Sequence, residues 1–189
     1  MTGFQWKETE NAMALEPTEK LKMDFALAAW DGEVGVLRRI LSTYPDAAAW
    51  THEDGGTTLC KAVAHGTAHI EAVKLLLEHG SDINAQNADG LTPLMFAAMH
   101  DKQACVTLFL EKEAKPELKD YRGRTASQIA YELGHHETAL SIVAYVQNKR
   151  DTAERERIQA LNADAAQAHS GLDHSVVIKK PLTMRPPHG

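Results

Sequence analysis

Apolar and polar residues alternate with a helical period along the middle of the chain. In one segment the apolar side chains recur every three or four positions and form a single stripe, at Ile70, Val73, Leu76 and Leu77. Between such segments stand short clusters rich in Gly, Asp, Asn and Thr, which favour turns. The pattern predicts short amphipathic helices joined by tight loops.

The ends of these helices also carry recognisable signals. Thr92 directly precedes Pro93, which is typical of an N-cap followed by a first-turn proline. Gly66 and Gly134 follow apolar stretches, where glycine enters the left-handed region at little cost and ends a helix. Each loop is therefore expected to introduce a pair of short helices.

The loop and the first helix of each pair recur at a nearly fixed interval. The pattern Gly-x-Thr-x-Leu occurs at residues 55–59 and 90–94, with a weaker copy at 123–127, so the spacings are 35 and 33 residues. A two-residue insertion, Thr67 and Ala68, accounts for the difference. An earlier copy without the loop signature lies at residues 23–41. The chain thus contains four repeat units.

One helix pair of this size cannot cover its own apolar face, so the copies must stack to bury a continuous core. The paired alanines Ala97 and Ala98 allow neighbouring helices to approach closely. We predict an all-α solenoid of helix-turn-helix units at residues 17–147, divided at about 17–51, 52–86, 87–119 and 120–147, between a lead-in at 1–16, a helical extension at 148–169 and a flexible tail at 170–189.

The same residues resemble the ankyrin repeat family over roughly residues 23–146. Unit three matches the family pattern D-x-x-G-x-T-P-L-H-x-A-A at Asp89, Gly90 and residues 92–94, and unit two matches the later positions at Gly80 and Asp82. The resemblance implies stacked helix pairs with short hairpin loops and, in most members, binding of another protein. It implies no cofactor.

The chain departs from the family pattern at two kinds of position. Cys60, Met95 and Gln128 replace the family's histidine after the leucine position, so the hydrogen bonds of that histidine must be absent or replaced. Asp101 and Glu113 stand where glycine would end the two helices of unit three. A residue other than glycine in the left-handed region costs about 1 kcal/mol.

Two segments flank the repeats on the C-terminal side. Residues 148–169 contain no Pro or Gly and carry Ile158 and Leu161 at helical spacing, which predicts a helix. The following tail contains a short apolar piece at residues 176–178. We interpret it as flexible, with a docking peptide as the alternative.

Composition restricts the classes of partner and the cellular compartment that we expect. The formal net charge of -6 argues against nucleic acid or an anionic membrane surface as the main partner. The two cysteines, Cys60 and Cys105, suggest no disulfide framework. The N-terminus lacks an export signal, and no run approaches the roughly 20 apolar residues of a membrane span. We expect a cytoplasmic protein that is a monomer on its own.

Ten histidines raise the possibility of metal binding or catalysis. No H-E-x-x-H motif occurs, and Gly66 separates His65 from His69, which breaks the helix that would align them. Cys60 is expected in the packed first-helix layer, where a buried thiol is inert. An enzyme or metal protein that uses His-rich loops remains an alternative, but we expect no catalytic residue, no metal and no cofactor.

Recognition is the remaining class of function. In ankyrin-like stacks the hairpin tips and first helices form a concave face that binds partners. We predict a non-enzymatic protein-protein interaction module, either a general adaptor or scaffold or a dedicated inhibitor or immunity-type partner of a toxic or regulated enzyme. The alternative for Trp30 and Tyr121 is that they cover the ends of the core. The predicted partner-binding residues are Trp30, Asp31, Trp50, Glu53, Asp54, His65, Asp89, Leu91, Met99, His100, Tyr121, Arg122, Arg124, Glu132 and Leu133.

Overall fold

The computed structural model describes residues 19–52, 56–64 and 69–170 of the chain. It separates into two compact units, residues 1–146 and 147–189. No β-strand occurs in the described residues, and one isolated bridge joins Thr51 to Thr57. The helical elements in chain order are α1 (Glu19–Asp31), α2 (Val34–Thr43), the 3-10 helix η1 (Pro45–Ala49), α3 (Thr58–Ala64), α4 (Ile70–Glu78), α5 (Pro93–Met99), α6 (Gln103–Glu111), α7 (Ala126–Glu132) and α8 (His136–Ser170).

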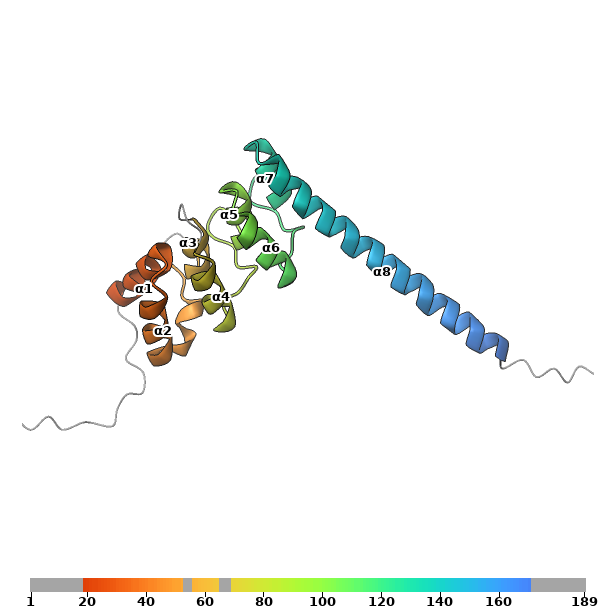
Figure 1. The fold of residues 1–189 in the computed structure, drawn as a ribbon, viewed down its shortest axis with the longest axis horizontal. Coiled ribbons are helices and arrows are strands. Elements are labelled where there is room, and N and C mark those ends of the chain that lie inside the picture. Colours follow the sequence, from red (N-terminus) through yellow and green to blue (C-terminus); the bar gives the residue numbers. More distant parts are fainter. Residues whose placement is uncertain (1–18, 53–55, 65–68, 171–189) are drawn as a thin grey trace, which may run out of the picture. The chain divides into compact units, whose positions relative to one another are not determined.

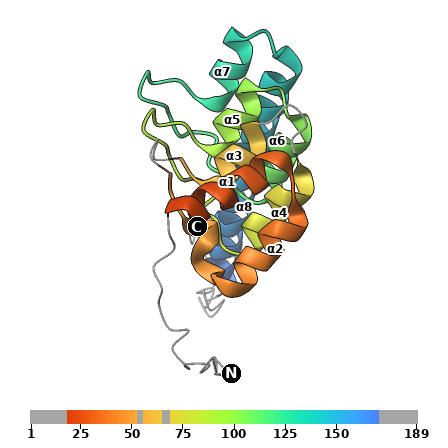
Figure 2. The same cartoon turned by 90° about the vertical axis from the view of Figure 1, so that its left-hand side faces the viewer.

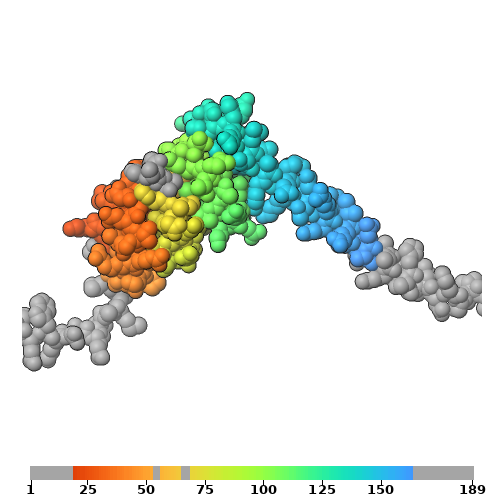
Figure 3. Space-filling view, in the orientation of Figure 1, coloured from red at the N-terminus to blue at the C-terminus, as the bar shows by residue number. Residues whose placement is uncertain are grey.

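The helices of the first unit form two layers. The first helices pack in series, α1 on α3, α3 on α5 and α5 on α7, while α2 packs on α4 and α4 on α6. Figure 1 shows the helix pairs following one another in chain order, and Figure 2 shows the loops of the later units on one side of the first-helix layer. The space-filling view shows the successive pairs in direct contact (Figure 3). The predicted all-α solenoid of stacked units is confirmed.

The core runs through both layers. Phe25, Leu59 and Leu94 occupy the same register position in successive first helices and are no more than 1% exposed. The second layer contributes Leu76 and Phe109, both fully buried. Small residues at the next register positions let these helices pack closely. They are Ala28, Ala29, Ala62, Val63, Ala97, Ala98 and Ala130, none more than 4% exposed.

Hydrogen bonds between units repeat with the sequence interval. The Ser81 hydroxyl donates to the carbonyl of Ala48, 33 residues earlier, over 2.7 Å. The Gln86 amide donates to the carbonyl of Lys119, 33 residues later, over 3.0 Å. Because the partners occupy neighbouring units, these bonds fix the register of the stack as well as satisfying loop carbonyls.

The turns confirm the helix signals of the sequence. Thr92 caps α5, with Pro93 in its first turn, and its hydroxyl accepts from the amide of Met95. Gly134 has a φ of 83° at the end of α7. Asp101 and Glu113 adopt left-handed backbone at φ of 53° and 62°, as predicted for residues that stand in place of glycine.

The side chains that replace the family's histidine contact the threonine three residues before them. The Thr57 hydroxyl donates to Cys60 Sγ over 3.6 Å. The Thr92 amide lies 3.5 Å from Met95 Sδ. In unit four, Gln128 Oε1 accepts from the Thr125 amide over 2.9 Å. These contacts use sulfur in units two and three and an amide oxygen in unit four.

The last helix continues past the repeats. α8 spans 35 residues, so the second helix of unit four and the predicted helical extension form one uninterrupted helix. In the described part of the chain, neither this helix nor any other is both long and apolar enough to cross a membrane.

Candidate binding surface

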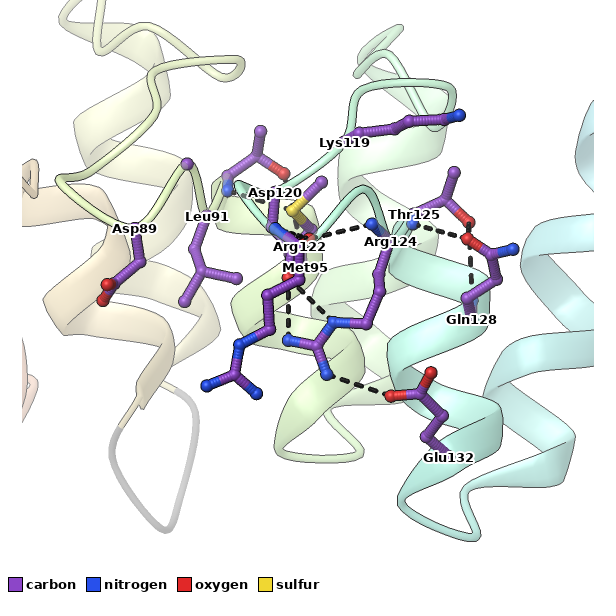
Figure 4. Close-up of polar contacts among 12 residues, drawn as sticks. Asp89, Leu91, Met95, Lys119, Asp120, Arg122, Arg124, Thr125, Gln128 and Glu132 are labelled. Atoms are coloured by element: carbon purple, nitrogen blue, oxygen red, sulfur yellow. Dashed lines mark hydrogen bonds and ion pairs between the residues drawn. The ribbon is translucent and has the colours of Figure 1, made fainter.

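Two hairpin loops are held by the same arrangement of hydrogen bonds. In the loop before α5, Asn87 Oδ1 accepts from the amides of Asp89 and Leu91 at 3.0 and 2.8 Å. In the loop before α7, Asp120 Oδ1 accepts from the amides of Arg122 and Arg124 at 3.0 and 2.8 Å. Each loop tip is therefore rigidly placed by one buried side chain, as Figure 4 shows for Asp120.

The loops also bond to one another and to the first helices. The Tyr121 amide donates to the carbonyl of Asp89 over 3.0 Å, which joins the two hairpins. Arg124 donates to Asp120 Oδ2 over 2.7 Å and to Glu132 Oε2 over 2.9 Å (Figure 4). Because Glu132 is the last residue of α7, this contact brings a loop and the end of a first helix onto one surface.

The hydrogen bonds and charges of this network shift the pKa values of Asp120 and Arg124. Burial would raise the pKa of Asp120, but the backbone and side-chain hydrogen bonds from Arg124 outweigh it and leave that pKa lowered. The hydrogen bond to Asp120, aided by the one to Glu132, raises the pKa of Arg124. Arg124 and Glu132 are therefore occupied within the molecule and position the surface.

Most of the predicted binding residues that are described lie on the surface. Tyr121 is 77% exposed at a hairpin tip, and Trp30 is 37% exposed at the end of α1. The exposed members are Asp31, Asp89, His100, Arg122, Glu132 and Leu133, while Leu91, Met99 and Arg124 are half-buried. These residues belong to the loop tips and the C-terminal ends of the first helices.

Trp50 is a correction to the sequence interpretation. It is only 8% exposed and packs edge-on against Phe25, with the ring centroids 5.6 Å apart, and against Tyr44 at 5.8 Å. It closes the core of unit one because a neighbouring helix covers it, which the sequence around it does not reveal. Glu53, Asp54 and His65 lie outside the described residues.

Sequence reasoning missed an open pocket of about 650 Å³ along α1 and α3. Its apolar lining includes Met23 and Leu27, which are 64% and 51% exposed, beside Trp30. The spacing of these three residues along α1 was the available signal. It was overlooked because the same stripe is compatible with a buried helix face.

The charge of the surface also differs along the stack. Asp31 and Asp89 are exposed acidic residues of the predicted surface. At the pocket beside α1, the charged lining residues are Lys20, Lys22 and Lys61 against Glu19 alone. The surface therefore carries charges of both signs, and the rim of this pocket is basic.

The chemistry available to the described residues is limited. They contain no group of three or more His, Cys, Asp or Glu side chains suited to a metal ion. Burial raises the pKa of the Cys105 thiol to about 11, and Cys60 is also buried. The Cys105 thiol is therefore protonated at neutral pH, and both thiols are shielded from reagents by burial.

Comparison with known proteins identifies the class. A family model described as ankyrin repeats in three copies matches residues 25–120 and 59–153, which together exceed half of the chain. The chain belongs to the ankyrin repeat family. Ankyrin repeats are generally protein-protein interaction modules, and the family is typically non-enzymatic.

Individual relatives share the repeats and differ in length. The putative ankyrin repeat protein YahD of Escherichia coli (strain K12) is 36% identical over 126 residues, which is 64% of this chain and 61% of that protein. The SH3 and multiple ankyrin repeat domains protein 2 of Homo sapiens is 32% identical over 100 residues, or 53% of this chain and 5% of that protein. The chain thus covers less than two thirds of either relative.

Proposed function

We propose that this chain binds a partner protein through the surface formed by its hairpin tips and the ends of its first helices. The observation that carries the proposal is the exposure of large side chains on a rigid scaffold. Tyr121 and Trp30 remain accessible on the described surface, and Met99 is half-buried between them in the repeat order. Tyr and Trp are the residues most often found at binding hot spots.

The scaffold supports the proposal because it lowers the cost of ordering the surface. Asn87 and Asp120 fix the loop tips, and Arg124 ties the last tip to α7. Residues that are already held lose little freedom on binding, so more of the contact energy appears as affinity. Arg122 and Asp89 extend from these tips and supply charges of both signs for orientation.

The way in which such binding acts is occupancy. The described residues offer no metal cluster and no activated thiol, so blocking, holding or localising one partner is the function we favour over catalysis. The sharper form is a dedicated inhibitor of one enzyme. The broader form is an adaptor with several partners. The buried free thiols are consistent with a reducing, cytoplasmic setting, which we include in the proposal.

The test compares a variant that loses two aromatic side chains of the proposed surface with a control that loses one exposed aromatic side chain outside it. The protein carrying both Trp30→Ala and Tyr121→Ala is used beside a Tyr131→Ala control, because Tyr131 is 67% exposed on α7 and is not part of the predicted surface. Each immobilised protein is mixed with lysate of the source cells, and the retained proteins are quantified by mass spectrometry.

The double variant is expected to lose the proteins that the wild type and Tyr131→Ala both retain, with little change in its thermal melting. One stoichiometric partner supports the inhibitor form, and several weak partners support the adaptor form. Equal recovery by all three proteins contradicts the proposed surface. A collapsed melt of the double variant would place Trp30 and Tyr121 in the core instead.

A further inference from the structure

The pocket along α1 is an incomplete end of the first-helix layer. Leu27, Phe96 and Ile129 occupy the same register position in units one, three and four. Ile129 is 1% exposed on α7, which packs against α5. Leu27 is 51% exposed, because among the described residues no helix precedes α1 to cover this position.

The exposed side chains form a continuous apolar floor. Met23, Ala26, Leu27 and Trp30 line the same open pocket, with a volume of about 650 Å³. Stacks of repeats need a capping element at each end, since the terminal unit otherwise exposes the face that its neighbours bury. The open volume of the pocket and its apolar lining therefore both favour a covering segment at this end of the stack.

The segment that lies directly upstream is residues 1–18. It joins α1 at Glu19, which is itself a lining residue of the pocket, so the segment begins its path at the pocket's edge. The 13 residues of α1 extend over roughly 20 Å, and an extended chain needs only about six residues to run back over that distance. Pro17 directly before this helix favours a change of direction.

The composition of the segment matches the pocket. It contains Phe4, Trp6, Met13 and Leu15, which suit an apolar floor. Its charged side chains are Lys7, Glu8, Glu10 and Glu16, so its formal charge is -2 (one Lys minus three Glu). The charged residues that line the pocket are Glu19, Lys20, Lys22 and Lys61, a formal charge of +2 (three Lys minus one Glu). Opposite charges favour this pairing over a basic occupant.

We propose that residues 4–16 dock in the pocket along α1 and cap the first-helix layer, with Trp6 or Phe4 against Leu27 and the glutamates against the lysines of the rim. The segment acts as a built-in ligand of the first unit. This contact lies within one chain and does not depend on the identity of any partner. Where the segment covers Trp30, a partner that binds the proposed surface displaces it from that residue.

The test uses the full chain with a photoreactive benzoylphenylalanine in place of Trp6. After irradiation of dilute protein, cross-links are mapped by mass spectrometry. We expect an intramolecular cross-link to α1 at Met23–Trp30 or to Lys61. A cross-link to a second copy, a cross-link to another part of the same chain, or no cross-link overturns the proposal.

Two sets of variants establish that the contact is specific. Leu27→Glu is expected to reduce the cross-link severalfold, whereas Leu140→Glu, at a side chain of similar exposure on α8, is expected to leave it unchanged. Combined Glu8→Lys and Glu10→Lys is also expected to reduce the yield, and Lys20→Glu with Lys61→Glu is expected to restore it. Circular dichroism checks that every variant is folded. A yield that ignores Leu27→Glu and the charge changes in a folded protein contradicts docking in this pocket.

Discussion

Replacing Asp101, a left-handed residue of unit three, by glycine should destabilise the fold. Asp101 and Glu113 have φ of 53° and 62°, so both carry the strain of a side chain in the left-handed region. At Asp101 the side chain also makes a contact with the next unit. The Asp101 carboxylate accepts from the hydroxyl of Thr138 over 2.5 Å, and Thr138 is fully buried at the start of α8.

The magnitudes follow from these contacts. Glycine removes about 1 kcal/mol of left-handed strain at either site, less a few tenths for the greater freedom of glycine in the unfolded chain. Asp101→Gly gains this relief, roughly 0.5 kcal/mol, but loses a charge-assisted hydrogen bond worth about 2 kcal/mol. Gln103 Oε1 lies 2.7 Å from the same Thr138 hydroxyl and can still accept its proton, which offsets roughly 0.5 kcal/mol of the loss. We expect a net loss of about 1 kcal/mol for Asp101→Gly.

Equilibrium urea unfolding measures this difference, with circular dichroism as the signal. Asp101→Asn is the matched control, because asparagine tolerates left-handed backbone and keeps an oxygen to accept from Thr138. It should lie between the wild type and Asp101→Gly. The reasoning is refuted if Asp101→Gly is as stable as the wild type or more stable, since the contact with Thr138 would then contribute nothing.

Three further predictions concern the loops and the thiols. Gly90→Ala should destabilise the fold by about 2 kcal/mol or more in thermal or urea melts, and Gly123→Ala by only about 1 kcal/mol. Both positions have positive φ, but only a methyl group added at Gly90 would lie 2.8 Å from the Tyr121 ring. Equal losses of stability would contradict this reasoning. The Asp120→Asn variant should remove part of the acid sensitivity of folding, measured as the free energy of unfolding between pH 7 and pH 2. The folded pKa of Asp120 is lowered, so its contribution is full above its unfolded pKa of about 4 and disappears as pH falls through the folded pKa; identical pH profiles would show that its network is unimportant. Cys105, whose pKa burial raises to about 11, should resist iodoacetamide at pH 8 in the native protein and react in urea, and rapid native labelling would show that the core opens.

The repeat fold could be predicted from the sequence because it depends on interactions between residues that are close in the chain. The 33-residue interval, the cap at Thr92 and the stop at Gly134 each depend on a few adjacent residues. The left-handed turns at Asp101 and Glu113 were likewise predicted from their place in the repeat. A unit that cannot bury its own apolar stripe must stack, so the architecture followed from the period.

The candidate surface was only partly accessible to the same reasoning. Loop tips such as Tyr121 and Asp89 are placed by turn chemistry, so their exposure follows from the register. Trp50 was misjudged because its burial depends on Phe25, a residue of another helix. Leu27 was missed because equivalent positions are buried or exposed according to whether a neighbouring unit is present.

The period, the caps, the turns and the repeat family could all be predicted from the amino-acid sequence alone. The packing of the units was needed to show which large side chains are covered, that Asp120 and Glu132 hold Arg124, and that the first unit has an open apolar pocket with a basic rim. The physical reason is the range of the interactions. Helix boundaries depend on hydrogen bonds between residues a few positions apart, whereas exposure and ion pairing depend on which elements the completed stack places side by side.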